Sequence, residues 1–201
     1  MQGRVVLDLS RLQMDAVGPR APLWWGTVGM IAIESTVFAL VIASYFYLRM
    51  RFPEWPPAGT PPPSLLMPSI NVAVLLVSFW PQYRIDVAVE SQDKKKLQRL
   101  LIIASGLGLL ACVLRYWDFA ALNTGWHDTS YGSIIWALLF LHSIHLSAST
   151  FETILMAWYV SEAPLDEKHR LDLNVNAIYW YFIVIAWVVI FTVVWGGPRV
   201  L

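Results

Sequence analysis

Five mainly apolar stretches constrain the fold of this chain more than any other feature. The third is the least distinct, because its charge-free centre, Leu100–Leu114, has only 15 residues and by itself also fits a buried helix of a soluble protein. A helix needs about 20 mainly apolar residues to span the hydrocarbon core, because each residue adds about 1.5 Å. We therefore expect an all-α integral membrane bundle of five transmembrane helices, built as one domain over residues 24–197. The expected spans cover about residues 24–48, 65–84, 97–122, 131–160 and 175–195.

The composition favours a membrane protein and excludes several other classes. Hydrophobic residues make up 57% of the chain and charged residues only 14%, whereas a soluble domain carries about 25% charged residues. This much apolar surface also excludes a disordered chain. The formal net charge is zero, so no basic excess is available to bind nucleic acid. The single cysteine, Cys112, excludes a disulfide framework.

Basic residues are distributed unevenly between the two sides that five spans define. Ten of the fourteen lie before the first span or in the second and fourth connections, and four lie on the opposite side. Cytoplasmic segments carry an excess of Lys and Arg. Residues 1–23 are therefore predicted to be a cytoplasmic segment, and the C-terminus is predicted to be external.

Three features near the span ends give further predictions. The polar stretch between Gln82 and Gln98 is interpreted as helix that leaves the bilayer and turns back, with a plain loop as the alternative. Arg115 is expected to extend its side chain to the interface, with Asp118 one turn on as its partner. The Gly-Gly-Pro sequence at 196–198 is expected to end the fifth span.

Polar side chains inside the spans gather on one stripe of the fourth span. His142, His145, Ser149 and Glu152 fall within a sector of about 80° on a helix. The stripe fits a His-x-x-His metal or haem site, or a polar seam that pairs with Glu34 in the first span. We favour the seam, because a di-metal bundle would need a second Glu-x-x-His motif, and we assign no catalytic residue and no metal ligand. Glu34 itself fits a proton-exchanging carboxyl or, as we favour, a neutral group hydrogen-bonded to another helix.

Aromatic and basic residues mark the two ends of the first span. Trp24 and Trp25 lie at its start, and Arg49 and Arg51 lie at its end. Tryptophan concentrates where a membrane meets water, so these four residues are candidate lipid contacts as well as ordinary interfacial anchors.

Four segments each carry a short motif. No single motif is distinctive, but their order along the chain is fairly specific for one family. GMIAIESTVFALVIASYFYLR (29–49) has an intramembrane Glu and an aromatic exit ending in Arg, and MPSINVAVLLVS (67–78) enters its span with Pro-x-x-Asn. SYGSIIWALLFLHSIHL (130–146) joins a Tyr-Gly-Ser start to a His-x-x-His core, and YWYFIVIAWVVIF (179–191) forms the last span. Together these segments resemble subunit III of the haem–copper terminal oxidases, in its short five-helix bacterial form, over roughly residues 24–195.

The resemblance implies a subunit that holds no haem or copper and docks beside catalytic subunit I and subunit II, which carry them. It also implies structural phospholipid in a cleft of the bundle, stabilisation of the catalytic subunit and support for proton uptake. The implied location is the bacterial inner membrane, with a larger respiratory assembly as a further partner. Glu34, His142 and His145 are the site residues that carry over best.

The chain also departs from the family pattern, which indicates a divergent branch. Phe140 replaces a usual Gly, Tyr181 a usual His and Val184 a usual Asp, while Asp118 stands for a usual Glu. Two alternatives stay open: an accessory subunit of a nitric oxide reductase, and a small proton-coupled secondary transporter that uses Glu34 and the polar stripe. Transporters of that kind tend to show inverted repeats, and we find none in the sequence.

Overall fold

The protein folds into five long helices, as the apolar stretches predict. The computed structural model describes residues 21–91, 93–162 and 167–200, and no strand occurs within these ranges. Five helical segments are long and apolar enough to cross a membrane, which confirms the all-α, five-span prediction. The helices are α1 (Pro22–Arg51), α2 (Leu66–Glu90), α3 (Lys94–Ala120), α4 (Ser130–Glu162) and α5 (Glu167–Phe191), followed by a π-helical turn, η2 (Thr192–Gly196), and the short α6 (Gly197–Val200).

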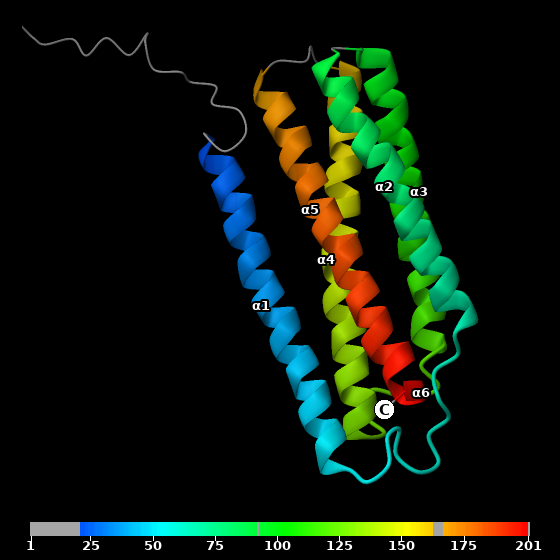
Figure 1. Ribbon diagram of the computed structural model, residues 1–201. Helices are drawn as coiled ribbons and strands as arrows, with labels where there is room; N and C mark the ends of the chain where they lie inside the picture. Colours follow the sequence, from blue (N-terminus) through cyan, green and yellow to red (C-terminus); the bar gives the residue numbers. More distant parts are fainter. Residues whose placement is uncertain (1–20, 92, 163–166, 201) are drawn as a thin grey trace, which may run out of the picture.

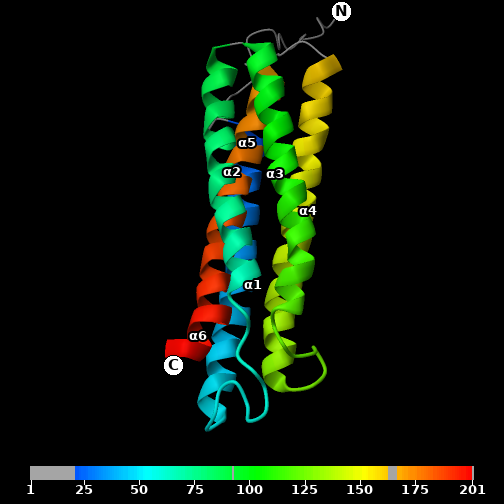
Figure 2. The ribbon, with the colours of Figure 1, turned by 90° about the vertical axis from the view of Figure 1, so that its right-hand side faces the viewer.

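Consecutive helices run in opposite directions, so α1 begins at one end of the bundle and α6 lies at the other (Figure 1). Helix α5 contacts α1, α2 and α4, and α3 packs against both α2 and α4 (Figure 2). The inner position of α5 explains why its large side chains Trp180 and Trp187 are almost completely buried. Helix α1 stands at one side, and only 11% of its most apolar stretch is buried within the chain. Most of α1 is therefore available to lipid or to another protein.

The polar stretch between the second and third spans is helical on both sides of a short turn. Helix α2 continues to Glu90 and α3 begins at Lys94, which confirms the interpretation of Gln82–Gln98 as helix that turns back. The side chain of Asp93 accepts a hydrogen bond of 3.1 Å from the backbone N–H of Lys96. This is an N-cap, which satisfies one of the free donors at the start of α3.

The prediction that residues 196–198 end the fifth span is wrong. The chain stays helical through η2 and α6 to Val200. The N–H of Gly197 bonds back to the carbonyl of Thr192, five residues earlier, and this wider turn continues the helix past Pro198. Gly197 is required by packing instead, because a Cβ atom there would lie 2.8 Å from the Tyr45 hydroxyl oxygen.

The proline-rich connection between α1 and α2 is attached to the α6 end of the bundle. Trp55 is buried, with its ring 5.3 Å from that of Tyr45 and 4.9 Å from that of Tyr131. Arg199 donates to the carbonyl of Pro63 at 2.6 Å. These contacts tie the connection to α1, α4 and α6.

Candidate functional site: two polar clusters inside the bundle

The first polar cluster joins α1, α4 and α5 and consists of Glu34, His145 and Tyr179; we call it the Glu34 cluster. The Tyr179 hydroxyl donates to the Glu34 carboxylate, with distances of 2.9 Å to Oε2 and 3.2 Å to Oε1. His145 Nε2 lies 3.4 Å from Glu34 Oε1, and both side chains are less than one-fifth exposed. The ring of Phe38 packs 5.5 Å from that of His145 and covers it. The cluster therefore lies between helices, largely shielded from the membrane.

The contact between Glu34 and His145 is attractive only where a proton lies on one of the two facing atoms, His145 Nε2 or Glu34 Oε1. His145 Nδ1 lies 2.6 Å from the carbonyl of Leu141, and a carbonyl can only accept, so Nδ1 carries a hydrogen. Nε2 is then a bare acceptor in a neutral ring and carries a second hydrogen in an imidazolium. An attractive Nε2–carboxyl contact thus exists either as neutral imidazole with carboxylic acid or as imidazolium with carboxylate. This pair has the chemistry to hold one proton and to exchange it.

The second polar cluster joins four helices around a buried cation; we call it the Arg115 cluster. Arg115 NH1 lies 3.1 Å from Asp118 Oδ2, and the two side chains are 5% and 0% exposed. Asn71 of α2 donates its amide to the same Asp118 oxygen. The guanidinium carbon lies 3.7 Å from the centre of the Trp187 ring of α5. The members of the cluster are Asn71, Arg115, Asp118, His142 and Trp187.

His142 belongs to the Arg115 cluster and is a neutral imidazole there. Its Nε2 lies 2.9 Å from the carbonyl of Ile183, so Nε2 carries the hydrogen and donates it. Its Nδ1 lies 3.0 Å from Arg115 NH2, and because a guanidinium only donates, Nδ1 accepts. With both nitrogens used in this way, His142 has no place for a second proton.

Arg115 does not reach the interface, contrary to the expectation from the sequence. The residue is 4% exposed, because its charge is compensated inside the bundle by Asp118, by the Trp187 ring face and by the lone pair of His142. A cation held in this way does not need water, although each ion loses several kcal/mol of hydration on burial. The predicted pairing with Asp118 is correct.

The structure divides the predicted seam between the two clusters. His145 meets Glu34, while His142 turns to Arg115. Ser149 is fully buried and makes no side-chain hydrogen bond among the described residues. Glu152 lies beside Asn176 of α5. Asn176 accepts hydrogen bonds from Gln82 at 3.1 Å and from Thr153 at 3.3 Å, which adds a polar contact between α2, α4 and α5.

The four candidate lipid contacts lie at the two ends of α1. Trp25 is 61% exposed and packs edge-on against Trp24, with the ring centres 5.0 Å apart. At the other end, Arg51 donates to the Tyr47 hydroxyl at 2.9 Å, and Arg49 lies two residues before it in the last turn of α1. The positions suit both lipid contact and anchoring.

Among the described residues, no group of three or more His, Cys, Asp or Glu side chains is placed to hold a metal ion. The residues that sequence reasoning missed are Asn71, Tyr179 and Trp187. Asn71 stands out as a polar residue in an apolar stretch, but its partner Asp118 is 47 residues away. Neither Tyr179 nor Trp187 differs in the sequence from the aromatic residues that serve only as anchors.

Comparison with known proteins agrees with the motif order. The family model for cytochrome c oxidase subunit III matches residues 17–197. Cytochrome c oxidase subunit 3 of Synechocystis sp. is 25% identical over 173 residues, covering 85% of this chain and 74% of the relative. Cytochrome c oxidase subunit 3 of Thermostichus vulcanus is 23% identical over 172 residues, covering 85% of each chain. The probable cytochrome c oxidase subunit 3 of Mycobacterium bovis is 27% identical over 177 residues, with the same coverage.

Proposed function

Because this chain belongs to the cytochrome c oxidase subunit III family, we propose that it is the non-redox-active subunit III of a respiratory haem–copper oxygen reductase. The observation that carries the proposal is the family match over residues 17–197, which includes all five spans and both polar clusters. Under this proposal the haem and copper reside in catalytic subunit I and subunit II, beside which the chain docks in the bacterial inner membrane.

The proposed role is to stabilise the catalytic subunit. The Arg115 cluster supports it, because contacts from four helices meet around one buried ion pair. Asn71 of α2 donates to Asp118, while His142 of α4 and the Trp187 ring of α5 contact Arg115. Polar contacts of this kind fix the register of helices against one another, since the alternative for each group is an unpaired position in hydrocarbon. When the helices are held in one register, the outer surface of the bundle keeps one shape, to which the catalytic subunit can bind.

The second proposed role is support of proton uptake, and the Glu34 cluster supports it. Glu34 Oε1 and His145 Nε2 lie 3.4 Å apart across α1 and α4, and Tyr179 adds a hydroxyl from α5. An ionisable group inside a membrane span is a candidate for proton exchange. The distribution of basic residues predicts that the turn between α2 and α3 lies on the cytoplasmic side, from which protons would be taken up.

The proposal is tested by identifying what assembles with the chain. An affinity tag on the N-terminus, followed by mild-detergent solubilisation, a native gel and mass spectrometry, gives a list of co-migrating proteins. We expect a multi-span catalytic subunit and a copper-carrying subunit in constant proportion to this chain. A band that contains this chain alone, as a homo-oligomer, would contradict the proposal and favour a transporter.

A further inference from the structure

Three buried polar atoms gather where the proline-rich connection meets the α6 end of the bundle. They are the hydroxyl oxygens of Tyr45 on α1 and Tyr131 on α4, and the indole Nε1 of Trp55 in the connection; we call them the Tyr45 cluster. Both tyrosines are 0% exposed and Trp55 is 7% exposed. None of the three atoms makes a hydrogen bond to another described residue. Because a buried polar atom without a partner loses its hydration and gains nothing in return, three such atoms in one place point to a missing partner.

The three groups lie close together around the ring of Trp55. Its centre is 5.3 Å from that of the Tyr45 ring and 4.9 Å from that of the Tyr131 ring, and both tyrosines are nearly perpendicular to it. The Trp55 N–H lies beside the Tyr45 hydroxyl but outside hydrogen-bond geometry. The two tyrosine hydroxyls are near enough to interact electrostatically. One small molecule can therefore reach all three.

The Tyr45 hydroxyl faces the bare backbone of α6 at Gly197. A Cβ atom on Gly197 would lie 2.8 Å from the hydroxyl oxygen, and the next-nearest atoms outside the adjoining backbone belong to the same tyrosine ring, at 3.6 and 3.7 Å. The wider π-helical turn η2, just before Gly197, brings this residue to the hydroxyl. The lack of a side chain at Gly197 leaves room in front of the hydroxyl for a group of about the size of a water molecule.

We propose that the Tyr45 cluster binds one ordered water molecule inside the bundle. An indole N–H only donates, whereas a tyrosine hydroxyl donates and accepts. A water can thus accept from Trp55 and from one hydroxyl and donate to the other, which gives it the three hydrogen bonds typical of buried water. The three groups carry no formal charge and suit a neutral molecule, while the Arg199 guanidinium donates to the carbonyls of Trp195 and Pro63 instead.

The water would attach the proline-rich connection to α1 and α4. Six of the eleven residues from Pro53 to Pro63 are prolines, and proline has no backbone N–H to donate. The connection therefore has few hydrogen bonds of its own to hold its path, and a bridged Trp55 supplies one that reaches the bundle. All the groups involved belong to this chain, so the site does not depend on the proposed oxidase role.

A density map of the complex that the tagged chain purifies in, at a resolution that shows ordered water, tests the site directly. We expect one peak at about 2.5–3.2 Å from the Tyr45 hydroxyl oxygen and from Tyr131 or Trp55. The absence of a peak, with Trp55 donating directly to Tyr45, would overturn the proposal. A peak that strengthens when chloride is replaced by bromide would also overturn it, because the ligand would then be a halide.

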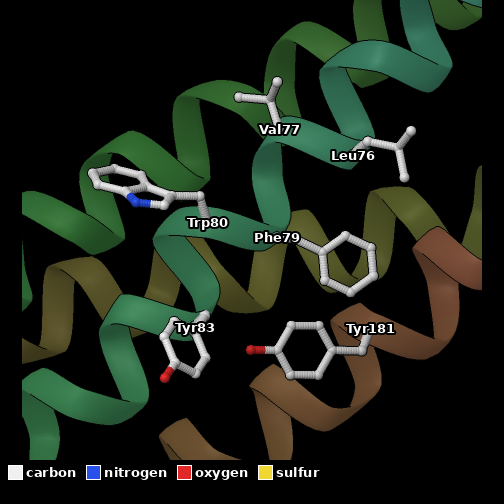
Figure 3. Close-up of a pocket in the computed structure, with 6 residues that line it drawn as sticks. All are labelled: Leu76, Val77, Phe79, Trp80, Tyr83 and Tyr181. Atoms are coloured by element: carbon white, nitrogen blue, oxygen red, sulfur yellow. The ribbon is translucent and has the colours of Figure 1, made fainter.

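Replacing each tyrosine by phenylalanine gives a second test, because the sign of the effect differs between a bound and an unpaired hydroxyl. The readout is the temperature at which half of the chain in the purified complex aggregates. Tyr83→Phe is the control, because Tyr83 lines the outer aromatic groove between α2 and α5 (Figure 3) and is 62% exposed. Its hydroxyl needs no partner inside the bundle, so the control should leave the midpoint unchanged.

We expect Tyr45→Phe and Tyr131→Phe each to lower the midpoint by about 2–4 °C, which is typical of one lost hydrogen bond in a chain of this size. The double variant should lose less than the sum, because both hydroxyls hold the same water. A higher midpoint in Tyr45→Phe would show that its hydroxyl is unpaired in the folded chain. Strictly additive losses would show that the two hydroxyls have different partners, and either result would overturn the proposal.

Discussion

The guanidinium carbon of Arg115 lies 3.7 Å from the centre of the Trp187 ring, on the ring face, between helices α3 and α5. The ring covers one side of the cation while Asp118 and His142 occupy its edge. The negative face of an indole ring attracts a cation most strongly when water is absent. This contact explains how a full positive charge is kept inside a membrane protein.

The pairing inside the Arg115 cluster predicts a strongly non-additive pair of variants. Arg115→Gln leaves the Asp118 carboxylate without its cation, and Asp118→Asn leaves the cation without its carboxylate. Each single variant should lower the free energy of unfolding by about 3–5 kcal/mol, measured by titration with denaturing detergent. The double variant, in which two amides can bond each other, should be more stable than either single one. Additive losses would show that the two side chains do not depend on each other.

The Glu34 cluster predicts a difference between two replacements of one carboxyl. Glu34→Gln keeps an oxygen for the Tyr179 hydroxyl and supplies an N–H to His145, so assembly with the partner should be almost unchanged. Glu34→Ala leaves both groups unpaired and should cost about 0.6–2 kcal/mol, seen as loss of the chain during purification of the complex. Tyr179→Phe, which removes one donor, should lie between the two. Equal retention of all three variants would contradict a stabilising role for the contacts of Glu34 with Tyr179 and His145.

If Glu34 exchanges protons for the oxidase, Glu34→Gln should affect oxygen consumption without affecting assembly of the complex. Oxygen consumption by the complex should fall in Glu34→Gln although the chain remains bound, because an amide cannot release a proton. The measurement is the turnover rate at several values of pH, compared with Thr36→Val, an exposed position of the same helix outside the Glu34 cluster. An unchanged rate would restrict the Glu34 cluster to packing.

Two glycines of α3 predict opposite effects of the same substitution. A Cβ atom on Gly108 would lie 2.8 Å from the Thr150 hydroxyl oxygen and 3.0 Å from the Trp180 ring, whereas nothing lies within 4 Å of the corresponding position on Gly106. Gly108→Ala should therefore push α3 away from α4 and α5 and lower thermal stability. Gly106→Ala should be neutral or stabilising by up to about 1 kcal/mol, since Ala favours helix. Equal behaviour of the two variants would mean that the helices do not approach so closely.

The orientation in the membrane predicts unequal labelling of two introduced cysteines. Ala58, in the proline-rich connection, and Ser91, in the turn after α2, are both exposed and lie at opposite ends of the bundle. In a Cys112→Ser background, an impermeant thiol reagent added to spheroplasts should label Ala58→Cys but not Ser91→Cys. Labelling of Ser91→Cys alone would show that the chain crosses the membrane in the opposite orientation to the predicted one.

The number and type of spans could be predicted because they depend on local sequence: length, hydropathy and charge at the ends. The contents of the clusters could not, because they depend on distant residues. His142 and His145 are one turn apart and differ by about 60° around α4, enough to send one toward Trp187 and the other toward Glu34. In the sequence, Arg115 resembles a residue at the membrane interface. It is buried because α5 packs nearby and places the ring of Trp187 against the guanidinium.

The central claim, that this chain is a subunit of a haem–copper oxygen reductase, is tested most directly by spectroscopy on its own purified complex. Material purified through a tag on this chain is measured by a reduced-minus-oxidised optical spectrum and by oxygen consumption with a reduced electron donor. The account predicts haem bands in constant ratio to the chain and turnover of oxygen that cyanide inhibits. A colourless preparation, or one whose haem protein reduces nitric oxide and not oxygen, would contradict it.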